Sequence, residues 1–407
     1  MLRRAFLLLA GTVGLADCTT VPYPASGGYY APPGPGQVPG PSRVAPGGRM
    51  AILLPLSGAR ADLGQPMLQA AQLALPGPEL ISQDTGGTPE GAAQAARTAL
   101  GAGVSLVLGP LTAPEVAAVS PIAHNAGVPV LAFSNDPAVA QPGVWPLGIT
   151  PRQQVQRLVT AGQQSGKSRF AALLPDNDFG HAMGSALTQA ATAAGLEPPE
   201  IHFHGSGMSG ISQGVRALSD YDARWGPVQQ QINAARAEGT SAGRRKAQEL
   251  SRTVLPPPPF DALLLGDTGE ALSEMAAVLP YYFVTQPAVQ FMGPSLWSDA
   301  RSGARELRGA WYAAPDPAAR AGFVASFTSR YGSSPPSVAD IAYDAASIAR
   351  VASGSGASLT NPSGFTGADG WLALLPDGQV RRGLAVFQIG PGGAGMVQPA
   401  TPAGPAA

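Results

Sequence analysis

The sequence predicts an α/β protein in which two lobes are built around parallel β-sheets. Short apolar segments alternate with helix-like segments along most of the chain. Apolar runs without polar alternation are typical of strands buried on both faces, which occur in parallel sheets with helical crossovers. At 407 residues the chain is long for one domain, since domains average roughly 150 residues. We therefore expect two lobes.

The expected elements follow one another in a regular order. Three strands and two helices are predicted first, at residues 50–55 (strand), 64–75 (helix), 104–109 (strand), 114–127 (helix) and 128–133 (strand). Further strands are predicted at 170–174, 261–266 and 289–292. In open parallel sheets ligands bind beyond the carboxyl ends of the strands, so the loops after these strands are the candidate site.

Three segments depart from this order. Residues 205–259 are polar, contain a helical stretch at about 229–252 and end in four prolines, which indicates an insertion packed on the surface of one lobe. Residues 19–48 are rich in Pro, Gly, Ser and Tyr without apolar periodicity and predict a disordered tether reaching roughly 30 Å. Residues 391–407 predict a similar flexible tail.

The amino terminus predicts export from the cytoplasm. Residues 1–18 have a basic start and an apolar centre too short to span a bilayer permanently, which is typical of a signal peptide. Leu15-Ala16-Asp17-Cys18 resembles a lipobox, in which the cysteine is lipidated, and the two arginines near the start resemble a twin-arginine signal. A plainly cleaved signal with an incidental cysteine is the alternative. We expect a periplasmic protein lipid-anchored through Cys18 to a membrane, the outer membrane.

Charge and motifs argue against several function classes. The formal net charge is −1, which gives no footprint for nucleic acid. Residues 205–210 fit Gly-x-Gly-x-x-Gly, but the preceding strand is brief and no acidic strand end follows, so a dinucleotide cofactor is disfavoured. His202 and His204 lack further metal ligands, and no nucleophile-elbow or metalloprotease motif occurs. We expect no enzyme activity, no cofactor and no metal site.

Four loops after predicted strands carry small and polar side chains. They contain Thr112, Asn135, residues 176–180, and Asp267 with Glu270. Amide, hydroxyl and helix-start N–H groups suit the capture of a carboxylate or another anion. Taken singly, each loop is better explained as a helix cap, a position that Ser, Thr, Asn and Asp favour.

In order and spacing, the segments resemble the type I periplasmic binding proteins of the branched-chain amino-acid receptor group. The matching pieces span residues 49–390 and include 52–58, 107–110, 126–130, 173–176, 290–294, 343–345 and 365–367. The resemblance implies two doubly wound lobes joined by three crossovers near residues 148, 286 and 356. The lobes would then be 49–148 with 287–356, and 149–286 with 357–390.

The same resemblance implies a ligand site in the cleft. Leu111, Thr112 and Asn135 would meet the carboxylate of an amino acid, and Glu270 its ammonium group. Ser134, Phe179 and Asp267 complete the implied lining. Asn135 stands where the family usually has Thr, and Phe179 where Tyr is common.

Two features resemble one branch of the family, the lipoprotein activators of penicillin-binding proteins. They are the polar insertion before residue 260, and residues 260–267 followed by Ser295-Leu296-Trp297. This resemblance implies a non-catalytic lipoprotein that regulates a peptidoglycan synthase, its protein partner. The alternative is the substrate-binding receptor of an amino-acid ABC transporter, with a small amino acid and a permease as partners.

Overall fold

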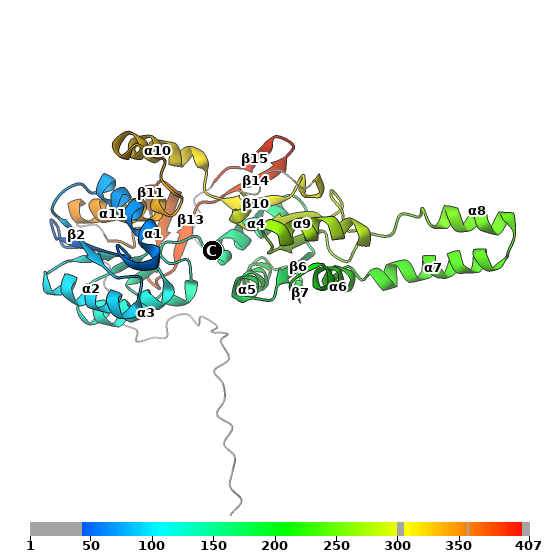
Figure 1. The fold of residues 1–407 in the computed structure, drawn as a ribbon, viewed down its shortest axis with the longest axis horizontal. Coiled ribbons are helices and arrows are strands. Elements are labelled where there is room, and N and C mark those ends of the chain that lie inside the picture. Colours follow the sequence, from blue (N-terminus) through cyan, green and yellow to red (C-terminus); the bar gives the residue numbers. More distant parts are fainter. Residues whose placement is uncertain (1–42, 299–304, 356–357, 401–407) are drawn as a thin grey trace, which may run out of the picture. The chain divides into compact units, whose positions relative to one another are not determined.

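The computed structural model describes residues 43–298, 305–355 and 358–400. Within them the chain forms two lobes, each around its own main sheet (Figure 1). Among the described residues, no helix is both long enough and apolar enough to cross a lipid bilayer.

The first lobe contains a five-stranded parallel sheet in the order β2-β1-β3-β4-β5. Its strands are β1 (Met50–Leu54), β2 (Leu80–Asp84), β3 (Leu106–Leu108), β4 (Val130–Ala132) and β5 (Val144–Pro146). Its helices are α1 (Ala61–Ala74), α2 (Pro89–Gly101), α3 (Ala113–Asn125), α10 (Pro317–Tyr331) and α11 (Ala339–Ser355). A small antiparallel sheet packs on this lobe, formed by β11 (Phe365–Gly367), β12 (Gly370–Leu374) and β13 (Val380–Arg382).

The second lobe contains a seven-stranded sheet in the order β15-β14-β10-β9-β8-β6-β7. Five strands are parallel: β6 (Phe170–Pro175), β7 (Glu200–His204), β8 (Ala262–Leu265), β9 (Gln290–Gly293) and β10 (Trp311–Ala314). Two antiparallel strands, β14 (Ala385–Gly390) and β15 (Gly393–Gln398), complete it. Its helices are α4 (Pro151–Gln164), α5 (Asp178–Ala193), α6 (Met208–Leu218), α7 (Tyr221–Ala237), α8 (Ser241–Leu250) and α9 (Gly269–Val278).

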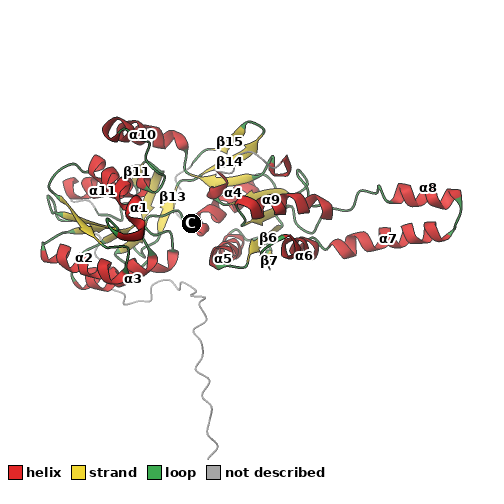
Figure 2. Cartoon of the chain, in the orientation of Figure 1, coloured by secondary structure: helices red, strands yellow, loops and turns green. Residues whose placement is uncertain are grey.

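Helices cover both faces of each main sheet, as Figure 2 shows. Along β1, Ile52 packs in a core shared with α1 and α11, whereas Leu53 packs in a core shared with α2 and α3. In the second lobe Leu173 faces α6 and α9, and Leu174 faces α4 and α5. Burying such a side chain stabilises the fold by about 1.5–3 kcal/mol. The predicted architecture of two doubly wound lobes is confirmed.

The crossovers differ from the predicted positions. The first, between β5 and α4, lies at residues 147–150. The second follows β10, because β9 and β10 pair with β8 in the second sheet. The third lies between β13 and β14, because α11 and β11–β13 pack in the first lobe. Residues 287–298 and 305–314 therefore belong to the second lobe and residues 358–382 to the first, which corrects the boundaries at 286 and 356.

The insertion is shorter than residues 205–259. Helix α6 buries Ile211, Val215 and Leu218 in the second-lobe core, so it continues the strand–helix order. The inserted part is the pair α7 and α8, two helices where one helical stretch was predicted. Its own small core holds Ile232 and Ala247, and Figure 1 shows the pair extending beyond α6 instead of lying on the lobe.

Both predicted disordered ends extend too far into the fold. Val44 is buried in the first-lobe core and Arg43 bridges to Ser358, so residues 43–48 are not part of a free tether. Residues 393–398 form β15, which pairs with β14 through backbone hydrogen bonds although its side chains are largely exposed. A strand that is held by backbone hydrogen bonds needs no apolar sequence pattern. The composition of residues 391–407 therefore did not indicate β15. Residues 1–42 and 401–407, including Cys18, lie outside the described residues.

Candidate functional site

All seven predicted site residues lie at or just beyond the carboxyl ends of parallel strands. Leu111 and Thr112 follow β3, and Ser134 and Asn135 follow β4. These two loops are neighbours, because β3 pairs with β4 and Phe133 N donates to Pro110 O at 2.9 Å. In the second lobe, Phe179 follows β6 and the segment with Asp267 and Glu270 follows β8; these strands also pair. Among the described residues, no hydrogen bond links the two groups.

Thr112 is engaged by the buried Glu115 in the first turn of α3. The Thr112 backbone N–H and hydroxyl donate to Glu115 Oε2, at N···O 3.0 and O···O 2.7 Å respectively. Thr85, after β2, donates its hydroxyl to the other carboxylate oxygen at 2.7 Å. The sequence Thr-x-x-Glu at 112–115 is the capping-box pattern. Glu115 and Thr85 were missed as members of this site, although that pattern could have identified Glu115.

Ser134 and Asn135 differ in exposure. The buried Ser134 hydroxyl oxygen accepts a hydrogen bond from Asp136 N at 3.0 Å, which stabilises the turn. Asn135 is exposed, and the backbone of Gly148 lies against it: a Cβ on Gly148 would come within 2.7 Å of Asn135. The first crossover therefore begins in direct contact with this loop. Leu111 is half-buried and packs at the edge of the first-lobe core.

A second acceptor in the first lobe organises the loops after β1 and β2. One Asp84 carboxylate oxygen accepts hydrogen bonds from the backbone N–H groups of Leu56, Ser57 and Gly86, at 2.9, 3.2 and 2.8 Å. Desolvation alone would raise the pKa of Asp84, but the hydrogen bonds from Ser57, Gly86 and Leu56 outweigh it and lower the pKa. These amides are thus already paired with a carboxylate of the chain.

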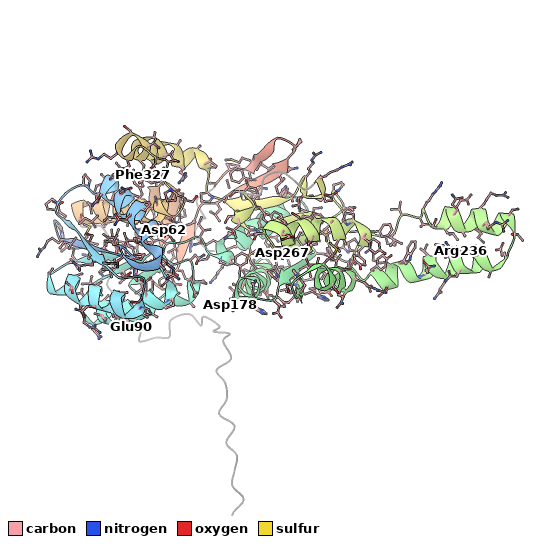
Figure 3. The ribbon with its side chains drawn as sticks, in the orientation of Figure 1. Asp62, Glu90, Asp178, Arg236, Asp267 and Phe327 are labelled. Carbon is pink, nitrogen blue, oxygen red and sulfur yellow. The ribbon has the colours of Figure 1, made fainter. Side chains whose placement is uncertain are left out.

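Asp267 is buried and paired with His204 from the end of β7. His204 Nε2 lies 3.0 Å from Asp267 Oδ2, and its Nδ1 lies 3.0 Å from Gly205 O. Trp297 Nε1 donates to the Asp267 carbonyl at 2.9 Å. Burial alone would lower the pKa of His204, but its hydrogen bonds to Asp267 and Gly205 outweigh this and raise the pKa. Figure 3 shows Asp267 among the side chains of this lobe.

Phe179 and Glu270 occupy the first turns of helices. Phe179 lies in α5, where Asn177 caps the helix by accepting from Gly180 N at 2.9 Å, and its ring packs at the edge of the core beneath α4 and α5. Glu270 is exposed in the first turn of α9 and has no hydrogen-bond or ion-pair partner among the described residues. Of the seven predicted residues, Asn135 and Glu270 are the two whose functional groups are exposed.

The Gly-rich segment 205–210 joins β7 to α6, so it does connect a strand to a helix. However, β7 is the edge strand of its sheet, whereas dinucleotides bind where the strand order reverses. His202 Nε2 lies 2.9 Å from Glu200 Oε1, so both histidines of β7 are paired with a carboxylate. Within the described ranges, no group of three or more His, Cys, Asp or Glu side chains could hold a metal ion.

A cluster of charged side chains lies where two crossovers meet, and the sequence alone did not indicate it. Arg382, fully buried at the end of β13, donates through Nη2 to the carbonyl of Leu147 in the first crossover. Its Nη1 lies 3.9 Å from Asp344 Oδ2 and 3.7 Å from Asp369 Oδ2. Burial and the nearby Asp369 raise the pKa of Asp344 to about 7, against the opposing effect of Arg382. No local pattern brings these three distant positions together.

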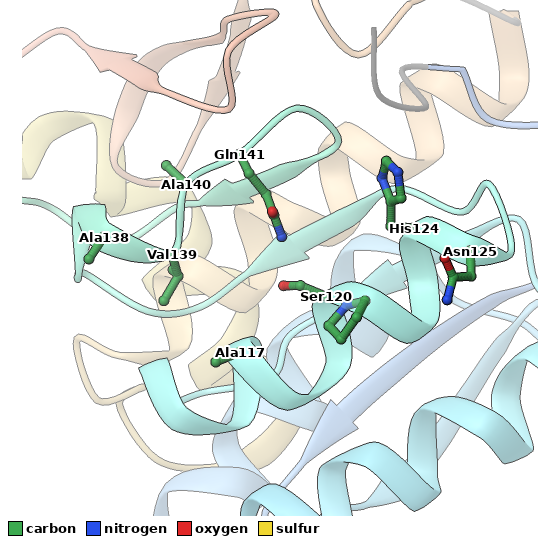
Figure 4. A pocket seen from close by; sticks show the side chains of 9 residues that line it. Ala117, Ser120, His124, Asn125, Ala138, Val139, Ala140 and Gln141 are labelled. Carbon is green, nitrogen blue, oxygen red and sulfur yellow. The ribbon is translucent and has the colours of Figure 1, made fainter. Parts of the chain in front are cut away.

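A surface hollow of about 490 Å³ lies between α3 and the short helix at Pro137–Val139 (Figure 4). Its polar lining includes Ser120, His124, Asn125 and Gln141. The Ser120 hydroxyl already donates to Val116 O at 2.7 Å, and none of the seven predicted residues contributes to the lining. The hollow is therefore separate from the strand ends.

Comparisons with known proteins agree on the fold. No curated protein matches the sequence. The structure is similar to a protein from Rhodospirillum rubrum described as a branched-chain amino acid ABC transporter, with a TM-score of 0.64 and 17% identity, covering 86% of this chain and 100% of that one. It is equally similar to the C-domain of LpoA from Haemophilus influenzae, described as a regulator of PBP1A (TM-score 0.64, 17% identity, 86% and 99% covered).

Full-length LpoA from Haemophilus influenzae matches with a TM-score of 0.64 and 15% identity over 88% of this chain, which spans only 59% of that protein. Of these similar structures, one is thus described as an ABC transporter and one as a regulator of PBP1A. The family model for periplasmic binding proteins matches residues 49–393, most of the chain. The chain belongs to the periplasmic binding protein family.

Proposed function

We propose that the chain is a non-catalytic periplasmic lipoprotein that regulates a peptidoglycan synthase of the penicillin-binding protein class. Membership of the family implies the periplasm as its location. The proposed lipid anchor is Cys18, which would attach the chain to the outer membrane. In this role the two lobes bind a partner protein instead of a small solute.

The observation that carries this proposal is that Thr112, the donor expected to bind the carboxylate of an amino acid, is already engaged within the chain. A ligand carboxylate would need the hydroxyl and N–H of Thr112, and both donate to Glu115. Breaking these bonds would leave Oε2 of the buried Glu115 carboxylate without donors, at a cost of about 1–3 kcal/mol. Asp267, expected in the lining of the cleft, is likewise paired with His204.

The similarity to the LpoA C-domain supports the same role, because that protein is described as a regulator of PBP1A. At 17% identity the similarity extends to the fold alone, so the role itself needs a direct test. The purified full chain should increase the rate of glycan polymerisation or peptide cross-linking by a purified penicillin-binding protein from the same cell, without any added small ligand. An unchanged rate with every such synthase would reject the regulator.

The alternative is a receptor for an amino-acid ABC transporter, and the exposed side chains of Asn135 and Glu270 favour it. A receptor with micromolar affinity would be stabilised by about 4 kcal/mol at a ligand concentration a thousandfold above its Kd. We expect that a panel of amino acids at millimolar concentration leaves the melting temperature unchanged. An increase of several degrees that is lost in Glu270→Gln, and kept in the matched control Glu274→Gln on the same helix, would establish the receptor instead.

A further inference from the structure

We propose that the hairpin of α7 and α8, with the aromatic group at its base, is a docking surface for a partner protein with an acidic surface. The proposed function enters only in naming a synthase as the first partner to test. Five basic and two acidic residues lie between positions 225 and 254, a surplus of three positive charges, whereas the whole chain has a net charge of −1. The basic residues are Arg236, Arg244, Arg245, Lys246 and Arg252.

The basic side chains of the hairpin are available to a partner. All five are exposed, and within the described part of the chain none forms an ion pair. Arg236, labelled in Figure 3, lies at the end of α7, and Arg244, Arg245 and Lys246 lie at the fourth to sixth positions of α8. These four are therefore closer in sequence to the tip that joins the helices than to the base. Such a patch steers and binds a surface of opposite charge.

The hairpin is held in one shape before any partner arrives. Thr240 caps α8 by accepting from Gly243 N at 2.9 Å. A Cβ on Gly243 would lie only 2.3 Å from Ala235 O, so glycine is needed for α8 to pack this closely on α7. At the base, the Arg224 guanidinium donates to the carbonyls of Ser219 and Pro256, both at 3.0 Å. A preformed surface loses less entropy on binding.

Aromatic side chains at the base supply a second, independent feature of an interface. Tyr221, Trp225 and Phe283 stack with ring centroids 6.1–6.5 Å apart, and Tyr282 meets Tyr221 edge to face at 5.0 Å. Phe283 is 38% exposed and Tyr281 72% exposed. Tyrosine, tryptophan and arginine are the residues most enriched among those that dominate binding energy.

The backbone of Phe283 strengthens this inference. Its φ of 58° lies in the left-handed region, which is unfavourable for a bulky residue. Arg224 donates to the carbonyls of Tyr282 and Phe283, at 3.3 and 3.4 Å, and so holds this turn in place. The fold thus maintains a strained turn that presents aromatic rings to solvent.

A protein fits this surface better than a lipid bilayer. Helices that bind in the membrane interface need a free apolar face. In the hairpin, Val228, Ile232 and Leu250 are used to pack α7 against α8. Positive charge near the tip of the hairpin and stacked aromatic rings at its base instead match a folded partner that offers carboxylates to the tip and an apolar depression to the base.

Charge reversal with a matched control tests the proposal. Arg244→Glu/Arg245→Glu/Lys246→Glu in the full chain should weaken binding to the purified synthase at least tenfold at low salt, and Tyr281→Ala should weaken it similarly. Arg97→Glu/Arg152→Glu/Arg350→Glu reverses three exposed charges on α2, α4 and α11 and should change the affinity less than twofold. An unchanged melting temperature in all variants shows that they fold. If the hairpin triple variant binds like the wild type, the docking surface is wrong while the regulator stands.

Photocrosslinking in cells tests the docking surface without assuming which protein the partner is. A benzophenone amino acid at the exposed Gln248 of α8 should crosslink to a protein identified by mass spectrometry, and the triple charge reversal should abolish the product. The same probe at exposed Gln94 of α2 should give no such product. If the captured, charge-dependent partner is not a synthase, the docking surface stands and the proposed function fails. If no crosslinked product forms, a protein partner is rejected. A protein partner is also rejected if no product forms and the purified chain instead floats with phosphatidylglycerol vesicles in a charge-dependent way.

Discussion

At the scale of single residues, Glu115 decides what the loop after β3 can bind. It accepts both donors of Thr112 and the hydroxyl of Thr85 while buried. We expect Glu115→Gln to lower the free energy of unfolding by about 1–3 kcal/mol, because an amide presents N–H groups to donors that need an acceptor. Urea unfolding measures the change. Thr112→Ser keeps the hydroxyl and should stay close to the wild type; equal stability of Glu115→Gln and Thr112→Ser would contradict this account.

His204 is the residue through which pH acts on the second lobe. Its Nδ1 faces a carbonyl, which only accepts, and its Nε2 faces Asp267, so the imidazolium is the favoured form and its pKa is raised above 6.5. The stabilisation is complete below the unfolded pKa and is lost as pH rises through the folded one. Unfolding at about pH 6 and about pH 9 should show a penalty for His204→Gln that shrinks at the higher pH. The control His202→Gln should show no comparable change.

The site residues could be placed from sequence, but their partners could not. Thr112 and Asp267 stand at strand ends, because local apolar runs mark where strands stop. That Asp267 meets His204 depends on β6 pairing with both β7 and β8, which brings positions 63 residues apart into contact. Local patterns carry no information about such a contact. A polar residue in a predicted loop is therefore only a weak indication of a ligand site, because its side chain can already be paired within the fold.

At the scale of elements, six buried strands were predicted to within two residues at either end, but the fully buried β5 was missed. The expected strands at 50–55 and 170–174 correspond to β1 and β6. The half-exposed edge strand β2 was missed, because Ser82, Gln83 and Asp84 break any apolar run. Strand β10 was missed as well, and without it the second crossover was placed before β9 instead of after β10.

The hairpin offers the sharpest test at this scale. Gly243→Ala places a Cβ 2.3 Å from Ala235 O, so α8 must move away from α7. We expect faster hydrogen exchange throughout α7 and α8, with unchanged exchange in β6 and β8, because the hairpin has its own core. Gly322→Ala in α10 meets no atom within 4 Å and should stabilise its helix by up to about 1 kcal/mol. Unchanged exchange in the hairpin of Gly243→Ala would refute the close packing.

At the scale of the whole molecule, side-chain hydrogen bonds tie the region of the first crossover to that of the third. Arg382 reaches Leu147 O, Gln153 Nε2 donates to Val380 O at 2.6 Å, and Trp145 Nε1 donates to Leu375 O at 2.7 Å. Each bond joins a segment near the first crossover to one near the third, about 230 residues away. Because the third crossover was placed at residue 356 from sequence, none of these ties could be foreseen.

Removing Arg382 should therefore destabilise the whole molecule in a pH-dependent way. Arg382→Met leaves the buried carboxyls of Asp344 and Asp369 without their cation, at a cost of about 3–5 kcal/mol. Burial already raises the pKa of Asp344 to about 7, and losing the cation raises it further, so protonation relieves the repulsion as pH falls. The penalty, measured by urea unfolding, should be large at about pH 8 and smaller at about pH 5. The exposed control Arg350→Met should change stability by less than about 0.5 kcal/mol at both. A penalty for Arg382→Met independent of pH would mean that the arginine acts through its hydrogen bond to Leu147 and not through its charge.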